Sequence, residues 1–500
     1  MSFGARQGAT VKKSHERIVN PAYRATNQPP ECDKFTIDMI VSFSTENFRS
    51  FKSEATLSLV ASSRLAGEHR HHTAAIPGSS AQVLRTAVIY GANGAGKSNL
   101  FKALSYLQSI VVPFSGPREG RDTEGTNREA FRFGDESDVP SAFDLQFISD
   151  DQLYRYFIKL DDKQITEEWL GDITDGRERM VFKRGQDRDV VLGEQMKAHT
   201  RLVALATVGS APNQSFLRTI GRSALSLPDI GPELSSVQTW FWHVLTLMGP
   251  GEPHAALWRK LNEDPTLLDF ASSFLRSSST GVDRLEIVRS PISPEELPSF
   301  VGETRARQLI DQASSGRRSF IRAMRVAGDA LIEIGAPEGF RLVRFQAAHK
   351  NEDGNSFSMD LDDESDGTRR LLDLLPALHQ MRSRGGVYFV DEIDRSMHPI
   401  LVRGLIEFFL SSCSHSAGQL IATTHESTLL DLSLLRRDEI WFAEKDREQA
   451  THLYSLADFQ VRTDLAIRKH YLEGRFGAIP FLGNLAQLTE GHDKPRDPQA

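Results

Sequence analysis

The sequence predicts an α/β protein with a mostly parallel sheet core, an antiparallel β lobe before it and a helical insertion between the two halves. Three observations lead to this prediction. Apolar strand-like runs alternate with helical patterns after about residue 340, which is typical of a parallel sheet. Residues 141–185 alternate apolar and polar side chains, as an antiparallel meander does. From about 190 to 335 the periodicity becomes helical.

The composition narrows the class of protein. Among 500 residues, 59 are Lys or Arg and 67 are Asp or Glu, so the net charge of −8 excludes a globally basic nucleic-acid-coating protein. Two cysteines, Cys32 and Cys413, allow neither a disulfide framework nor a thiolate zinc cluster, which fits a reducing cytoplasm. No uncharged apolar run is long enough to span a bilayer. We therefore expect a cytoplasmic protein without membrane contact.

Five segments are expected in chain order. Residues 1–38 are polar, basic and without period, which predicts a disordered leader and makes Met39 a candidate natural start. The other four are an N-terminal lobe (39–190), the helical insertion (191–335), a C-terminal lobe (336–482) and a flexible tail (483–500).

Within the two lobes, strands and helices are predicted from apolar periodicity. The N-terminal lobe has a strand from Val83 to Tyr90 and a helix from Lys97 to about Ile110. The C-terminal lobe has strands at Arg341–Ala347, Ser356–Leu361, Val387–Val390, Gln419–Thr423 and near Glu439–Ala443, with helices at Thr368–Arg382 and Pro399–Ser411.

A glycine-rich turn connects the first of these strands to its helix. It reads Gly91-Ala92-Asn93-Gly94-Ala95-Gly96-Lys97-Ser98, followed by Asn99, and it fits the phosphate-loop pattern G-x-x-x-x-G-K-[ST] in full. Its backbone N–H groups can surround a β-phosphate, because glycines let the chain curl. Lys97 is expected to reach the β- and γ-phosphates, and the Ser98 hydroxyl to ligate Mg²⁺.

An apolar strand downstream ends in two carboxylates, Asp391 and Glu392. In phosphate-loop enzymes the first acid of such a pair holds Mg²⁺, and in some classes the second polarises the attacking water. We therefore expect Asp391 and Ser98 to hold the metal and Glu392 to act on the water.

Three further motifs follow the order found in ATP-binding-cassette (ABC) ATPases. Residues 364–368 (Glu-Ser-Asp-Gly-Thr) resemble the signature motif, residues 394–399 (Asp-Arg-Ser-Met-His-Pro) resemble the D-loop, and His425 resembles the switch histidine. The resemblance implies an ATPase that uses ATP and Mg²⁺ and works as a head-to-head dimer or higher homo-oligomer. It also implies that Ser365 and Gly367 bind the nucleotide of the opposite subunit, that Asp394 lies at the nucleotide, that Glu392 is the base, and that His425 senses the γ-phosphate.

Two further segments indicate which branch of the ABC ATPases the sequence resembles. Residues 40–51 are similar to the N-terminal strands of SMC-type and RecF-type heads, which implies that Arg49 touches the nucleotide. Residues 471–480 resemble the end of AAA-type ATPases from prokaryotic anti-phage defence islands, which are related to the ATPase domains of OLD nucleases. No TOPRIM nuclease domain follows His425. The resemblance thus implies an ATPase subunit that senses or regulates an effector acting in trans, expected to be a nuclease.

The alternative is a RecF-like or SMC-like DNA-binding ATPase of DNA repair or chromosome maintenance. An arginine segment at 305–325 supports DNA contact if Arg318, Arg322 and Arg325 share one helix face, but a solvated helix face explains it equally well. The family's Q-loop glutamine has two candidates here, Gln146 and Gln152, each of which also fits an ordinary strand or turn.

Two other polar clusters are expected to be surface features. His69, His71 and His72 favour a surface loop, with metal binding as the alternative. Asp161, Asp162, Glu167 and Glu168 are expected to face solvent in a turn-rich stretch.

Overall fold

The structure is a computed structural model, and every described residue lies in the unit that begins at Thr36. It describes residues 36–112, 125–134, 138–174, 176–187, 189–224, 230–250, 257–313, 319–322, 330–336, 339–412, 418–460 and 466–479. The expected tail and nearly all of the expected leader lie outside these residues.

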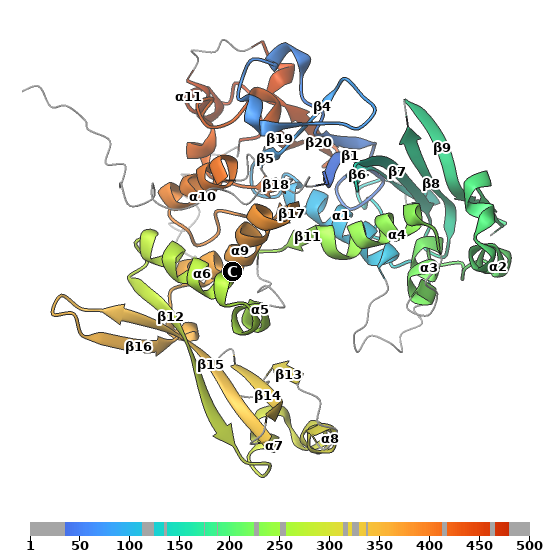
Figure 1. The fold of residues 1–500 in the computed structure, drawn as a ribbon. Coiled ribbons are helices and arrows are strands. Elements are labelled where there is room, and N and C mark those ends of the chain that lie inside the picture. The colour runs from blue at the N-terminus through green and yellow to red at the C-terminus, as the bar shows by residue number, and fades with distance from the viewer. Residues whose placement is uncertain are drawn as a thin grey trace, which may run out of the picture. The chain divides into compact units, whose positions relative to one another are not determined.

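The centre of the fold is a six-stranded sheet in the order β11-β17-β18-β5-β19-β20 (Figure 1). Neighbouring strands pair in parallel, except that β19 and β20 are antiparallel. This confirms the predicted mostly parallel core. Its strands are β5 (Thr86–Tyr90), β11 (Leu245–Met248), β17 (Gly386–Val390), β18 (Gly418–Thr423), β19 (Ile440–Lys445) and β20 (Thr451–Ser455).

Both faces of this sheet are buried, because successive side chains of a strand point to opposite faces. In β5, Ala87 and Ile89 join one core with helix α1 (Lys97–Val111), whereas Val88 and Tyr90 join a second core. Helices α9 (Asp366–Ser383) and α10 (Pro399–Ser412) supply that second core, for example through Leu375 and Phe409. The strand ends that carry the sequence motifs are thus fixed by packing from both sides.

The predicted antiparallel lobe is a seven-stranded sheet in the order β10-β9-β8-β7-β6-β1-β2, with all neighbours antiparallel. It shares the first core with α1. Its strands are β1 (Met39–Glu46), β2 (Ala55–Ser58), β6 (Ser141–Ser149), β7 (Gln152–Leu160), β8 (Ile165–Thr174), β9 (Arg177–Arg184) and β10 (Val190–Leu192). A short hairpin of β3 (Thr73–Ala75) and β4 (Gln82–Leu84) precedes β5.

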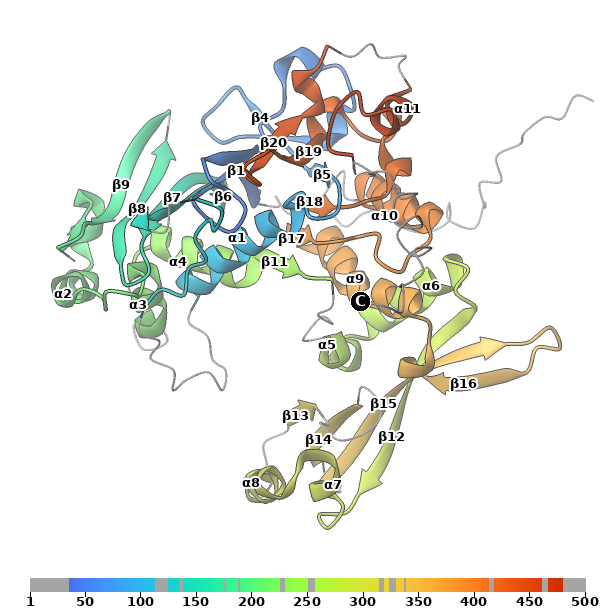
Figure 2. The same cartoon turned by 180° about the vertical axis from the view of Figure 1, so that it is seen from behind.

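The insertion expected to be helical at 191–335 contains helices α2 to α8, but it also contains strands that the helical expectation did not include. Strand β11 lies inside this range and forms an edge of the central sheet. Strands β12 (Val282–Ile292), β13 (Ser319–Arg322) and β14 (Ala330–Ala336) also lie in it, and they join β15 (Gly339–Lys350) and β16 (Ser356–Asp360) in a separate antiparallel sheet (Figure 2). Long-range pairing decided these segments, because strand formation depends more on partners than on local propensity. The domain boundaries themselves stay a prediction.

The helices of this range cover the other structural layers. Helices α7 and α8 pack on the separate sheet in a third small core. The helices of this range are α2 (Thr200–Val208), α3 (Phe216–Ala224), α4 (Pro232–Thr239), α5 (Leu257–Glu263), α6 (Pro265–Ser277), α7 (Leu297–Val301) and α8 (Glu303–Ala313). Outside this range, α11 spans Ile467–Leu472. Among the helices described, none combines the length and apolar character that crossing a bilayer requires.

The arginine segment does not form the single helix face that we considered. Helix α8 ends at Ala313, and Arg322 lies in strand β13, which pairs with β14. Arg317, Arg318 and Arg325 lie outside the described residues. DNA contact by this segment stays a prediction, without the helical geometry that favoured it.

Glu168 is also placed differently from our expectation, since it is fully buried in β8. Its carboxylate accepts hydrogen bonds from the backbone N–H of Phe216 at 2.7 Å and from the Tyr156 hydroxyl at 3.0 Å, and it lies 3.6 Å from Arg184. Burial raises its pKa despite these partners. Glu168 therefore joins the antiparallel sheet to α3 rather than facing solvent.

Candidate functional site

The glycine-rich turn after β5 has the backbone geometry that its sequence predicts. Gly96 has a φ of +109°, a conformation that side chains rarely adopt, and a Cβ there would lie 2.1 Å from Thr451 Oγ1. A Cβ on Gly91 would lie 2.5 Å from the Ala443 carbonyl oxygen. Asn93 and Gly94, at the tip of the turn, are exposed. The loop is thus pressed against β19 and β20 on one side and open on the other.

Lys97 is the first residue of α1 and its side chain folds back over this loop. Its Nζ donates hydrogen bonds to the carbonyl oxygens of Gly91 (2.7 Å) and Ala92 (3.2 Å) and lies 3.4 Å from His425 Nδ1. Burial lowers the pKa of Lys97 to about 8, although Asp391, Asp394 and Glu392 oppose the shift. Burial and the nearby Lys97 also lower the pKa of His425.

Ser98 and Asp391 meet although 293 positions separate them in the chain. The Ser98 hydroxyl donates to Asp391 Oδ1 at 3.1 Å. Thr423, at the end of β18, donates to the same oxygen at 2.6 Å. Asp391 is almost fully buried and has its second oxygen, Oδ2, left over from these bonds. Hydroxyl and carboxylate oxygens in one place form a donor set that suits Mg²⁺.

Glu392 follows β17 in a strained conformation. Its φ is +50°, in the left-handed region that a residue with a side chain rarely occupies. Its backbone N–H donates to Thr423 Oγ1 at 2.8 Å, which holds the turn in place. Within the described part of the chain, no hydrogen bond engages the Glu392 carboxylate, so this group is available to a ligand or a water molecule.

Asp394 and His425 are joined through the backbone. The His425 N–H lies 3.3 Å from each carboxylate oxygen of Asp394. His425 itself is exposed, directly after the buried Thr423 and Thr424. The structure therefore brings six of the predicted residues to one edge of the central sheet: Gly91, Lys97, Ser98, Asp391, Asp394 and His425.

The signature-like residues lie at the start of α9 and do not join this cluster. Ser365 caps the helix, since its Oγ accepts from the Thr368 N–H at 3.2 Å. A Cβ on Gly367 would lie 2.5 Å from the Ser396 carbonyl oxygen, so the glycine is needed for packing of α9 against residues 394–399. Ser365 and Asp366 are exposed. No hydrogen bond between Ser365 and residues 91–98 occurs among the described residues.

Arg49 lies near the loop but is engaged elsewhere. Its guanidinium pairs with Glu129, and its backbone N–H donates to the Glu129 carbonyl at 2.7 Å. The next residue, Ser50, accepts hydrogen bonds from Asn99 Nδ2 and Thr451 Oγ1, both at 2.8 Å. Asn99 thus supports the loop from behind in this structure, and nucleotide contact by Arg49 stays a prediction.

Neither glutamine candidate for the Q-loop is at the loop. Gln146 pairs with Ser42 in the first half of β1, and Gln152 Nε2 donates to the Ile173 carbonyl at 2.9 Å. Ser50, which contacts the loop helix, follows the opposite end of β1. Both glutamines are therefore explained by the antiparallel sheet.

Sequence reasoning missed Thr423 and Arg370. Thr423 ends an apolar strand just before His425, and a polar residue in that place was the available signal. Arg370 lies in α9, and its guanidinium donates to the carbonyl oxygens of Gly249 (3.1 Å) and Asp391 (3.0 Å). Arg370 therefore connects the helix that starts at Ser365 to the strand end that carries the acidic pair.

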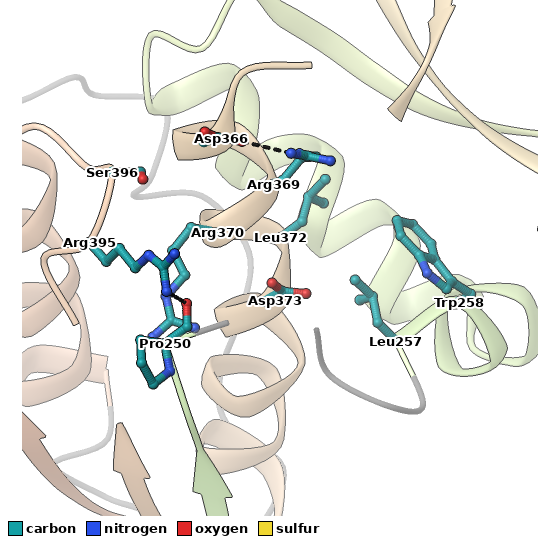
Figure 3. A pocket seen from close by; sticks show the side chains of 10 residues that line it. All are labelled: Pro250, Leu257, Trp258, Asp366, Arg369, Arg370, Leu372, Asp373, Arg395 and Ser396. Atoms are coloured by element: carbon teal, nitrogen blue, oxygen red, sulfur yellow. Dashed lines mark hydrogen bonds and ion pairs between the residues drawn. The ribbon is translucent and has the colours of Figure 1, made fainter. Parts of the chain in front are cut away.

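A pocket of about 280 Å³ lies beside this connection (Figure 3). Arg370 and Arg395 line it, and Arg395 donates to the Pro250 carbonyl at 2.5 Å. Asp366 and Arg369 form an ion pair of 2.6 Å at its edge. The pocket therefore adjoins the signature-like residues rather than the phosphate loop.

The residues of the cluster fit a nucleotide with Mg²⁺. Cβ atoms at Gly91 and Gly96 would collide with neighbouring strands, so the loop depends on glycine for its shape. Among the described residues, the Lys97 ammonium is bound to loop carbonyls and His425, partners that a phosphate can replace. Ser98 and Asp391 offer the oxygen ligands that Mg²⁺ prefers.

Comparison with protein families gives an independent result. Residues 87–194 and 218–431, more than half of the chain, match the family described as "AAA domain, putative AbiEii toxin, Type IV TA system". The chain belongs to this family. The matched ranges of this AAA-type domain contain the phosphate loop, the acidic pair and His425, which are the clustered residues. No curated protein matches the chain.

Solved structures with a similar fold are SMC heads. The chain is similar to the SMC head domain from Thermotoga maritima, with 12% identity, a TM-score of 0.35, and coverage of 83% of this chain and 98% of that one. It is also similar to an Smc head bound to the winged-helix domain of ScpA, with 15% identity, a TM-score of 0.34 and coverage of 83% and 97%. A third is an Smc head from Pyrococcus furiosus with an extended coiled coil, at 12% identity, a TM-score of 0.34 and coverage of 84% and 96%.

Proposed function

We propose that this protein binds and hydrolyses ATP as an ABC-type ATPase subunit, and that it regulates an effector protein in prokaryotic anti-phage defence. The observation that carries the ATPase proposal is the meeting of Ser98 and Asp391 at 3.1 Å, beside Lys97 and His425. Two motifs far apart in the chain thus supply one set of phosphate and metal ligands. Membership of an AAA-type family supports the same activity.

Each residue has a role that follows from its place. The backbone of Gly91–Ser98 binds the β-phosphate, and Lys97 exchanges its loop carbonyls for phosphate oxygens. Mg²⁺, held by Ser98 and Asp391, supplies charge neutralisation when bound. Glu392, whose carboxylate is unengaged, orients and deprotonates the attacking water. His425 donates a hydrogen bond to the γ-phosphate, with Asp394 holding its backbone.

A dimer completes this site in our proposal. Ser365 and the N-terminus of α9 are exposed and face no phosphate loop of their own chain, so they are available to the γ-phosphate of a second copy. Arg370 then links that contact to the acidic pair of its own subunit, so that the two sites communicate. ATP closes the dimer and product release opens it.

The regulatory role rests on the family description and on the resemblance of residues 471–480. The family description names a toxin of a toxin–antitoxin system, and such a system has two components. A separate effector protein, for which a nuclease is our expectation, fits this arrangement. Copurification of the untagged partner encoded by the adjacent gene, with and without ATP, tests it. Absence of a stable partner under both conditions would contradict the regulatory role and leave the ATPase proposal standing.

The ATPase proposal is tested with Lys97→Ala. The purified full chain is expected to hydrolyse ATP only with Mg²⁺, and loss of one charge donor to the transition state should lower kcat by about 10²–10³-fold. Lys102→Ala is the matched control, because Lys102 is an exposed lysine of the same helix. Equal turnover by Lys97→Ala and the control would overturn the proposal.

A further inference from the structure

The segment between β2 and β3 places three histidines together outside the ATP site. One ring nitrogen from each of His69, His71 and His72 lies within 4.8 Å of the other two. The rings of His69 and His72 stack with centroids 4.8 Å apart, and His71 meets His72 edge-on at 4.3 Å. Such a gathering of imidazoles is the donor set that zinc-class ions prefer.

His72 is held by a buried carboxylate. Its Nδ1 lies 3.0 Å from both oxygens of Glu439, and both side chains are almost fully buried. This contact occupies Nδ1 and leaves Nε2 as the nitrogen that can bind an ion. A carboxylate on the far nitrogen of a histidine is the usual outer partner of a metal ligand, because it fixes the orientation of the ring.

His69 is oriented in a similar way by the backbone. Its Nε2 lies 2.8 Å from the Leu432 carbonyl oxygen, which can only accept, so Nε2 carries the proton and Nδ1 keeps its lone pair. His71 is exposed and opens the cluster to solvent. Two histidines are therefore fixed in position, and the third can move to meet an ion.

Charged groups of both signs surround the three histidines. Asp438 binds Arg436 through two hydrogen bonds of 2.8 and 2.9 Å, and Glu68 pairs with Arg437 at 2.8 Å. These arginines are therefore compensated. Glu439 contacts His72 and also accepts the Arg436 backbone N–H at 2.7 Å, and Arg85 is a further cation that acts on His72.

We propose that His69, His71 and His72 bind a divalent transition-metal ion of the zinc class, with Glu439 as the outer carboxylate that positions His72. A Zn–N distance of about 2.0–2.1 Å requires the three nitrogens to be roughly 3.3 Å apart, so the rings draw together when the ion binds. The ion ties the β2–β3 segment to residues 432–439, which lead into β19. This proposal is independent of the ATPase proposal.

The test uses the full chain without a polyhistidine tag, stripped with EDTA and titrated with Zn²⁺ alone. Wild type is compared with His71→Ala and with His243→Ala, an exposed histidine outside the cluster. We expect wild type and His243→Ala to bind one more Zn²⁺ per chain than His71→Ala. Zn²⁺ should also raise the melting temperature of the first two proteins and not of His71→Ala, because only a folded site binds the ion.

The contrary results are equally clear. If His71→Ala binds as many Zn²⁺ ions as wild type with the same affinity, or if wild type binds none at micromolar Zn²⁺, the three rings are a stacked cluster without a metal and the proposal is wrong. Glu439→Gln tests the outer carboxylate, and we expect it to weaken Zn²⁺ binding by about 10–100-fold. Unchanged affinity in a folded Glu439→Gln protein would overturn the role of Glu439.

Discussion

The phosphate-loop region and the signature region of this protein differ in how complete they are. Around Lys97, the loop, the acidic pair and His425 are joined by hydrogen bonds from three strand ends. Around Ser365, the described side-chain bonds stay local: Ser365 bonds to Thr368 and Asp366 to Arg369 at the same helix end, and Glu364 bonds to His349 of β15. The first region is assembled within one chain, whereas the second is a capped helix end open to solvent.

This difference suggests to us that nucleotide binding and hydrolysis have different structural requirements. Binding needs only the assembled region, so a single chain should bind nucleotide. Hydrolysis, in our proposal, also needs the open region of a second copy. The predictions below are arranged to separate these two requirements, from the largest expected effect to the smallest.

Glu392→Gln should have the largest effect, because it removes the base and keeps a side chain of similar size. We expect turnover to fall by about 10²–10⁴-fold while ATP remains bound. Single-turnover hydrolysis and nucleotide-retention assays measure the two effects separately. If the variant fails to retain ATP, then Glu392 is needed for nucleotide binding rather than for the chemical step alone.

Ser365→Arg should lower hydrolysis strongly and leave ATP binding by single chains intact. The large side chain lies where the second subunit must dock, and loss of one transition-state contact alone is worth about 10²–10³-fold in kcat. Ser383→Arg, at the exposed far end of the same helix, is the control.

Mixing Ser365→Arg with Lys97→Ala tests whether the two regions act in trans. A mixed dimer contains one composite site without either lesion and one site with both. We expect part of the activity to return, measured in single-turnover assays once mixed dimers are confirmed. Activity no higher than in either variant alone would contradict the shared site, unless repeated turnover needs both sites intact. Single-turnover assays on the mixed dimer distinguish these two cases.

Arg370→Met should sever the connection between the regions at a moderate cost in stability. Its loss leaves two buried carbonyl oxygens without their donor, so unfolding should become easier by about 1–3 kcal/mol. Arg369→Met is the matched control, because that side chain is half exposed in a surface ion pair, a kind worth about 0–1 kcal/mol. Urea denaturation midpoints compare the two variants. Equal midpoints would contradict the role of Arg370 in connecting the two regions.

The smallest effect is a pH dependence of binding. Burial lowers the pKa of Lys97 from 10.5 to about 8, and phosphate oxygens favour the protonated form. Binding should therefore take up a proton above pH 8, so that affinity falls as the pH rises further, by up to about tenfold per unit. Calorimetry in two buffers of different ionisation enthalpy measures this uptake. It should be absent in Lys97→Ala, and uptake in that variant would assign the proton to another group.

The phosphate-loop region can be predicted from the sequence more completely than the contacts that connect it to the signature region. The conformation of Gly91–Ser98 can be predicted locally, because three glycines followed by a helix allow few backbone conformations other than a phosphate loop. The apolar strand before Asp391 is also evident from the sequence. Arg370 could not be predicted, because its partners lie after other strands and only packing brings them together. For Thr423 the local signal was a polar residue at the end of an apolar strand, but its partner Asp391 could not be read from the sequence nearby. Glu168 looked like a solvent-facing acid for the same reason, as nothing local reveals Arg184 and α3.

The support behind the phosphate loop has a consequence for synthesis of the protein. The Thr451 hydroxyl donates to the Ala95 carbonyl and the Thr451 backbone N–H donates to the Ser50 carbonyl, across 356 and 401 positions of the chain. Because contacts between such distant positions form only after the whole intervening chain exists, the loop gains its support when β20 has left the ribosome. Until then the nascent chain contains the phosphate-loop motif without the strands that support it, so we expect nucleotide binding only after β20 has been synthesised.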